Sequence, residues 1–156
     1  EEMRACSATL NALINDELKL HIEICGREGI DEATLFAVEE APQNLVYTRY
    51  VLDAGYGGDF LDMLAALAPC VLGYGEIGAR LDASATSDTY REWIDAYCGG
   101  EYQEVCQEFG VLMDKAFQKR LGEIDAETVR MPALQKRFNM ATKLEAGFWQ
   151  MGLENI

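Results

Sequence analysis

The sequence has a single histidine, His21, and its five cysteines include no CxxC pair. These two deficits argue against a His-rich metal site and against a structural zinc site. The cysteines are odd in number and lie far apart, so we expect reduced thiols in a cytoplasmic protein rather than a disulfide framework. The 27 acidic residues could still form a carboxylate-bridged metal site by chance, but solvated helix faces are the commoner use of such residues. We therefore expect no metal.

Basic residues are scarce, with 13 lysines and arginines against 27 acidic residues and a formal net charge of −14. A chain of this charge repels phosphate backbones and anionic lipid, which excludes direct nucleic-acid binding. Long hydrophobic runs are also lacking. Residues 58–75 come closest to the ~20 apolar residues of a membrane span, but Asp59, Asp62 and Pro69 interrupt them. Neither nucleic acid nor a membrane is therefore an expected partner.

Alternation of apolar and polar residues, the pattern of a β-strand, is absent, whereas helical spacing recurs along the whole chain. Tyr47, Tyr50, Val51 and Ala54 are spaced as on one helix face, although the chemistry of this segment also suits a strand. Further helices are expected at about residues 101–121 and 126–152. The length of 156 residues suits one domain. The sequence predicts an all-α fold, a single helical bundle of about six or seven helices over residues 1–156.

The segment LDMLAALAPCVLGYGEIGARL, residues 61–81, is a predicted helix with a proline inside it. Pro69 has no N–H to donate to the Ala65 carbonyl, so we expect the helix to bend there. Cys70 and Tyr74 are four residues apart and share a face beside this bend. A thiol in that position could be a reactive group. The alternative is a small buried hydrophobic residue, which is the commoner use of cysteine in proteins.

An aromatic stripe is predicted in YREWIDAYCGG, where Tyr90, Trp93, Ile94 and Tyr97 lie at helical spacing. Such a stripe usually packs in a core. A buried tyrosine, however, needs a partner for its hydroxyl, and Tyr47 and the other tyrosines named above would make this core unusually rich in hydroxyl groups.

A carboxyl group is predicted among aromatic rings in LEAGFWQMGL, where Glu145 shares a helix face with Phe148 and Trp149. Desolvation among rings favours the protonated form of a carboxyl group, which can then act as a general acid. The alternative is that Glu145 reaches solvent at the edge of its helix, as most glutamates do.

Taken together, these segments resemble the TenA family, also known as thiaminase II or aminopyrimidine aminohydrolase. The resemblance begins at Asp16 and rests on NDELKLH, YTRYVLDAGYGGDFLDMLAALAPCVLGYGEIGARL, YREWIDAYCGG and FNMATKLEAGFWQMGL, in this order and at matching spacing. The proline-cysteine pair in the apolar helix marks the cysteine-type branch of the family.

The resemblance implies a haem-oxygenase-like helical bundle that assembles as a homotetramer and binds a thiamine-derived pyrimidine in an internal pocket. It implies hydrolysis of aminomethylpyrimidine, or of thiamine, to hydroxymethylpyrimidine without a metal or organic cofactor. Cys70 would be the nucleophile and Glu145 the acid/base group. The remaining matched positions would line the pocket around the small-molecule substrate: Tyr47, Tyr74, Tyr97 and Phe148.

One departure from the family pattern concerns the start of the chain. Family members carry N-terminal helices with an aspartate that contacts the pyrimidine, and this sequence has no counterpart, so we expect a segment upstream of residue 1. Without it, apolar residues between Leu10 and Leu18 should be exposed.

Two other readings stay open. The chain could be a non-catalytic helical module that binds a thiamine-related pyrimidine, or a redox enzyme on the same fold. The single histidine and the acidic charge disfavour the redox enzyme.

Overall fold

The computed structural model describes residues 1–86, 88–123 and 128–154, apart from the side chains of Ala12 and Asp16. All regular structure in these ranges is helical, and no strand occurs in them. This confirms the predicted all-α fold. Backbone contacts divide the chain into two compact units, residues 1–41 and residues 42–156. The single domain of residues 1–156 stays a prediction.

The first unit contains one continuous helical run and one short helix. The run consists of α1 (Glu2–Ala12), a π-helical segment η1 (Leu13–Glu17) and α2 (Leu18–Arg27), and it is followed by α3 (Glu32–Phe36). Asp31 caps α3, because its side chain accepts a hydrogen bond of 2.8 Å from the Thr34 N–H. Four large apolar side chains of this run are 40–56% exposed: Leu10, Leu13, Ile14 and Leu18.

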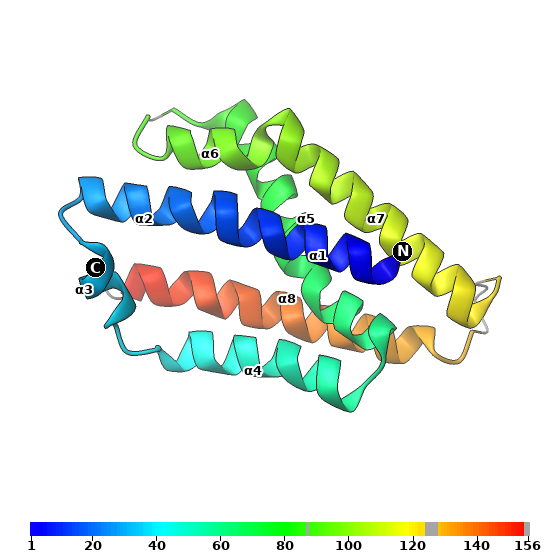
Figure 1. Ribbon diagram of the computed structural model, residues 1–156. Helices are drawn as coiled ribbons and strands as arrows, with labels where there is room; N and C mark the ends of the chain where they lie inside the picture. Colours follow the sequence, from blue (N-terminus) through cyan, green and yellow to red (C-terminus); the bar gives the residue numbers. More distant parts are fainter. Residues whose placement is uncertain (87, 124–127, 155–156) are drawn as a thin grey trace. The chain divides into compact units, whose positions relative to one another are not determined.

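The second unit is built around one long central helix. Its helices are α4 (Pro42–Gly57), α5 (Phe60–Ser84), α6 (Arg91–Cys98), α7 (Gly100–Leu121) and α8 (Met131–Glu154). α5 packs against each of the other four, and α4 lies antiparallel beside α8 (Figure 1). Ala126, where the sequence predicted the start of the last helix, lies outside the described residues. The segment around Tyr47 and Tyr50, which could have been a strand, is helical.

The start of α5 is determined locally, by a capping box. The Asp59 side chain accepts from the N–H groups of Leu61 and Asp62, at 2.8 and 3.2 Å, and Asp62 accepts from the Asp59 N–H at 2.9 Å. A run of small and aliphatic residues then follows, and its side chains form the core with α7 and α8. The buried members of this core are Leu61, Leu64, Ala65, Ala68, Phe109, Ala116 and Leu134.

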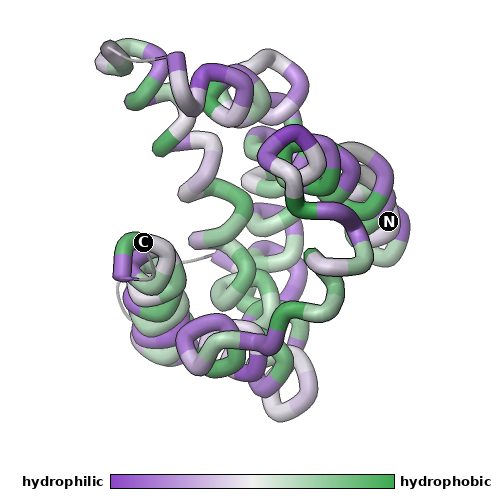
Figure 2. The backbone as a smooth tube through the Cα atoms, turned by 90° about the vertical axis from the view of Figure 1, so that its left-hand side faces the viewer, coloured by the Kyte–Doolittle hydropathy of each residue, from purple (hydrophilic) through white to green (hydrophobic). Residues whose placement is uncertain are grey.

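Apolar residues are concentrated on α5, whereas the turns of most helices alternate between apolar and polar residues (Figure 2). By length and composition, α5 is the one helix in the described ranges that could cross a membrane. It is surrounded by four helices of its own unit, however, and nine of its residues are buried. Its apolar character is therefore explained by its place at the centre of the bundle.

Candidate functional site

Tyr47 on α4 is the point at which the predicted site residues meet. Its side chain is 8% exposed, and its ring centroid lies 6.4 Å from that of Phe148 on α8. Burial raises the pKa of Tyr47 far above its ordinary value, and the neighbouring Glu145, Cys70 and Tyr74 raise it further. Because each of these groups acts on the same hydroxyl, the structure brings all three around Tyr47.

Glu145 lies in the interior and not at a solvent-exposed helix edge. Its residue is 8% exposed, and Ala141, one turn earlier on α8, is fully buried. Glu145 Oε2 and the Tyr47 hydroxyl are both buried, and neither oxygen has a hydrogen-bond partner of full geometry among the described residues. The two groups are nevertheless close enough for Glu145 to raise the pKa of Tyr47 as a hydrogen-bonding neighbour. Buried polar atoms in this state are suited to binding a polar molecule.

Cys70 is half-buried on α5 and follows directly after the buried Pro69. α5 runs unbroken through this proline. The Ala65 carbonyl nevertheless loses the N–H that a regular helix would supply four residues later. Tyr74, one turn beyond Cys70, lies on the same side, as the sequence predicted, and its hydroxyl acts electrostatically on Tyr47. The thiol, the phenols and the carboxyl group therefore come from three different helices.

Tyr97 on α6 reaches this group through ring contacts. It is 2% exposed, and its ring centroid lies 5.1 Å from that of Tyr74 and 4.5 Å from that of Trp93. Trp149 of α8 closes the cluster, with its ring 5.6 Å from the rings of both Tyr74 and Trp93. Tyr90, which was predicted to belong to the aromatic stripe, is 71% exposed and does not join this cluster. It precedes the first turn of α6 and is therefore not held on the helix face.

Two residues of α7 that the sequence analysis missed hold the aromatic cluster against α5. The Tyr102 hydroxyl donates to the Val71 carbonyl at 3.1 Å, and its ring packs edge-on against Tyr97 at 4.8 Å. The Gln103 amide donates to the carbonyls of Gly75 and Tyr97, at 3.1 and 3.0 Å. Helical periodicity could not reveal these contacts, because they join residues of different helices.

A possible metal-binding group occurs outside this site but is occupied by a guanidinium group. Ligand atoms of Asp82, Asp95 and Cys98 lie within 4.8 Å of one another. Arg91 reaches into this group: its Nη2 is 2.6 Å from Asp82 Oδ1, and its Nε is 2.8 Å from Asp95 Oδ1. The cation of Arg91 therefore balances these carboxylates, and the group is best explained as a surface ion-pair network.

A cleft of about 640 Å³ lies elsewhere in the second unit and contains none of the six predicted site residues. It is lined by Leu72, Gly110, Met113, Asp114, Phe117, Gln118, Gly122 and Met131. Its wall is mostly apolar, and none of its lining residues carries a buried polar side-chain atom without a partner. The thiol, carboxyl and phenol groups that could react or bind lie around Tyr47 instead, so we place the candidate site there.

Comparison with known proteins points to one family. The model of the TENA/THI-4/PQQC family matches residues 1–155. A crystal structure of a TenA family transcription regulator from Silicibacter sp. TM1040 is 54% identical, with a TM-score of 0.94 over 97% of this chain and 67% of that chain.

Two curated relatives match nearly the whole chain. The aminopyrimidine aminohydrolase of Halalkalibacterium halodurans is 31% identical over 97% of this chain and 66% of its own length. An uncharacterized protein of Haemophilus influenzae is 33% identical over 98% of this chain and 69% of its own length. The chain thus spans about two thirds of the length of these relatives.

Proposed function

Because this chain belongs to the TENA/THI-4/PQQC family, we propose that it is an aminopyrimidine aminohydrolase of thiamine salvage. The observation that carries the proposal is the meeting of a thiol, a carboxyl group and a phenol around one buried hydroxyl, that of Tyr47. The relative from Halalkalibacterium halodurans bears this name, which supports the same activity here. The substrate would be aminomethylpyrimidine, with thiamine as a second candidate.

Cys70 and Glu145 would divide the reaction between them. Glu145 protonates a ring nitrogen of the pyrimidine, which makes the ring a better electrophile. The Cys70 thiolate then adds to ring carbon C6. The electron pair moves through the ring and breaks the bond between the exocyclic methylene and its amino group, which is an ammonium group at neutral pH and leaves as ammonia. Water adds to the methylene and loses a proton. Departure of the thiolate from C6 returns the ring proton to Glu145 and restores aromaticity, so that one water is consumed and one ammonia released.

Aromatic and phenolic groups would hold the substrate in place. Phe148 offers a ring face for the pyrimidine, and Tyr47 offers a hydroxyl that its raised pKa keeps protonated. Tyr74 and Tyr97, which pack against each other, would form the adjoining wall. This chemistry calls for no metal or organic cofactor. A cytoplasmic location and a homotetramer belong to the same proposal and rest on the reduced thiols and on the family resemblance.

A second candidate is a pyrimidine-binding module without catalysis. It is favoured by one relative, the protein from Silicibacter sp. TM1040 that is named a transcription regulator and is 54% identical. Such a module would use the same site, and its net charge of −14 makes direct contact with DNA unfavourable.

Hydrolysis of aminomethylpyrimidine, followed as release of hydroxymethylpyrimidine, tests the enzyme against the module. We expect turnover by the wild type and a loss of about 10³-fold or more in Cys70→Ser, because a serine hydroxyl is scarcely ionised near neutral pH and the site has no histidine base. Cys25→Ser and Cys106→Ser are matched controls and should keep the wild-type rate. A folded Cys70→Ser protein of full activity would make Cys70 a packing residue. Binding without turnover by the wild type would favour the module.

A further inference from the structure

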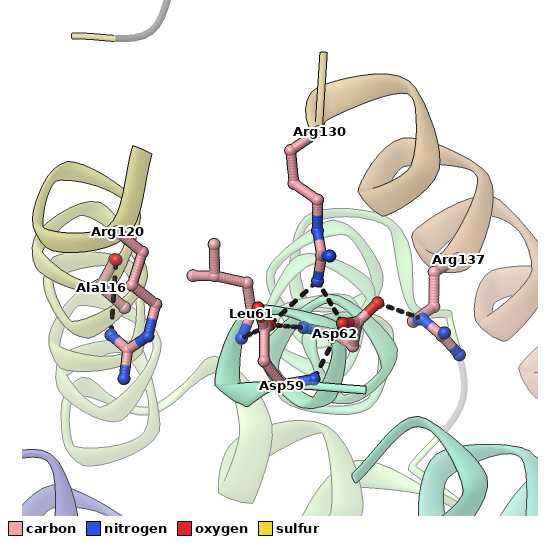
Figure 3. A network of polar contacts seen from close by, with 7 residues as sticks. All are labelled: Asp59, Leu61, Asp62, Ala116, Arg120, Arg130 and Arg137. Atoms are coloured by element: carbon pink, nitrogen blue, oxygen red, sulfur yellow. Dashed lines mark hydrogen bonds and ion pairs between the residues drawn. The ribbon is translucent and has the colours of Figure 1, made fainter. Parts of the chain in front are cut away.

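An ion-pair network centred on the buried Asp62 joins the start of α5 to the start of α8 (Figure 3). Asp62 on α5 is 6% exposed, and its carboxylate accepts from Arg137 Nε at 2.9 Å and also from Arg130 Nη2. Arg130 makes a second ion pair, with Asp59, at 3.1 Å. Although burial alone would raise the pKa of Asp62, the Asp59 N–H and the two arginines lower it overall. The carboxylate is therefore ionised and held by charged partners from the other helix.

A second contact joins α5 and α8 one turn beyond Cys70 and Glu145. The rings of Tyr74 and Trp149 lie 5.6 Å apart. In this pair, as in the pair Asp62–Arg137, the α8 residue is numbered 75 positions after the α5 residue. The two helices therefore keep one register over three turns, and both run in the same direction along it.

The same register pairs two alanines and then the two proposed catalytic residues. Ala66 falls opposite Ala141, and both are fully buried. One turn further, Cys70 falls opposite Glu145. On each helix the paired residues lie four positions apart. Side chains four positions apart form ridges on a helix surface, and in the commonest class of helix packing these ridges of the two helices interlock. Helices packed in this way cross obliquely, as α5 and α8 do in Figure 1.

We propose that Asp62 and Arg137 are positioning residues, whose ion pair sets the register of α8 on α5 and so holds Glu145 opposite Cys70. The register itself follows from the contacts above, whereas its catalytic consequence rests on the proposed function. Apolar contact alone specifies the register of α8 on α5 weakly here. The two alanine side chains are small and alike, so a shift of one helix along the other changes their contact little. A slip of one turn, about 5.4 Å, would instead leave the buried Asp62 carboxylate without Arg137. A buried carboxylate that loses one of its two charged partners is incompletely compensated, which is disfavoured, and fixing register is the best-attested use of buried polar pairs.

Arg137 also fixes α4, the helix that carries Tyr47. The Tyr50 hydroxyl donates to the Arg137 carbonyl at 3.4 Å, and the guanidinium carbon lies 5.9 Å from the centroid of the Tyr50 ring. Tyr50 is one turn after Tyr47 on α4. Arg137 thus contacts α5 and α4, the helices that carry Cys70 and Tyr47.

Thiol cross-linking tests the register without reference to activity. Glu145→Cys places a thiol opposite Cys70, and dibromobimane becomes fluorescent only when it joins two thiols. We expect a cross-link between positions 70 and 145, identified by peptide mass spectrometry, and none with Ala146→Cys, because Ala146 is exposed and one position out of register. Adding Arg137→Met to Glu145→Cys should remove most of the cross-linked product. Adding Leu134→Ala, which opens the core on the same helix and leaves the ion pair intact, should not.

Enzyme kinetics tests whether the ion pair between Asp62 and Arg137 affects catalysis. Arg137→Met should lower kcat by about 100-fold, the effect expected of a ~1 Å misplacement of a reacting group, while KM for aminomethylpyrimidine changes little. Arg137→Lys keeps the positive charge and should recover part of the rate. It replaces Arg137→Met in both experiments if circular dichroism shows that the methionine variant is unfolded. Leu134→Ala, measured well below its melting temperature, should keep the wild-type kcat.

The outcomes separate the two proposals. Equal cross-link yields in the Arg137→Met and Leu134→Ala backgrounds would overturn the positioning role, as would a fall in kcat that merely follows the fall in melting temperature in both variants. If the wild type does not hydrolyse aminomethylpyrimidine but the cross-linking results are as expected, the proposed function fails and the register set by Asp62 and Arg137 stands.

Discussion

Gly78 of α5 lies directly against the backbone of Tyr97 on α6. A Cβ added at Gly78 would be 2.8 Å from both the carbonyl carbon and the Cβ of Tyr97, and 2.9 Å from the Cys98 nitrogen. These neighbours are backbone atoms or are attached directly to the backbone, so they cannot rotate away. The absence of a side chain at this position is therefore what allows α6 to hold Tyr97 against Tyr74.

Gly78→Ala should consequently destabilise the protein and disturb the candidate site. We expect a loss of about 1–3 kcal/mol in the free energy of unfolding, as for other overpacked interiors, measured by urea denaturation. Gly73→Ala is the matched control on the same helix, because an added Cβ there meets nothing within 4 Å. It should stabilise the helix by about 0.5–1 kcal/mol. Equal effects of the two substitutions would show that the α5–α6 contact can accommodate an added methyl group.

Tyr47→Phe should affect ligand binding more than folding. The hydroxyl is buried without a hydrogen-bond partner of full geometry, so its removal should leave the melting temperature nearly unchanged or slightly higher. Loss of a hydrogen bond to the pyrimidine should weaken binding by about 1 kcal/mol, roughly fivefold in Kd. Calorimetric titration with aminomethylpyrimidine measures this difference, and an unchanged Kd would remove Tyr47 from the substrate contacts.

Glu145→Gln should abolish most turnover and keep much of the binding. The amide has the shape of the carboxyl group but cannot deliver a proton to the ring nitrogen, so kcat should fall by about 10²–10⁴-fold. Titration with aminomethylpyrimidine should give a Kd close to that of the wild type. The reverse pattern, weak binding with normal kcat, would make Glu145 a binding residue and not the acid.

Asp62 should make the stability of the protein depend on acid pH. Its pKa in the folded protein is below the ordinary value of 3.8, so the folded state binds fewer protons than the unfolded chain between these two values. The stabilisation from the ionised Asp62 is therefore fully present above the ordinary pKa and is lost as the pH falls through the folded pKa. Urea unfolding of Asp62→Asn should differ most from the wild type at neutral pH, and the difference should shrink below about pH 4.

The control for this dependence is the exposed pair Arg91–Asp82. Asp82→Asn should change stability little at any pH, because solvent screens such surface pairs. A difference between wild type and Asp62→Asn that stays constant down to pH 2 would mean that packing of the side chain, and not its charge, is responsible.

The sequence by itself determined the features that depend on neighbours within a few residues. The capping box of Asp59 and Asp62, the helix around Tyr47 and the common face of Cys70 and Tyr74 follow from helical spacing and from local hydrogen bonds. The predicted site residues also meet in the structure, but the sequence identified them as a group only through resemblance to a family, since periodicity indicates a face and not the helix that it contacts.

Only the tertiary structure decided which faces meet and at what register. The place of Asp62 in the first turn of its helix depends on near neighbours, whereas its ion pair with Arg137 joins positions 75 apart in the chain. Tyr102 carries no local signal for its bond to Val71, and nothing local distinguished the exposed Tyr90 from the buried Tyr97. The physical reason is that each helix carries its own pattern of apolar and polar residues, but the energy of a contact between helices depends on both surfaces and on their register together.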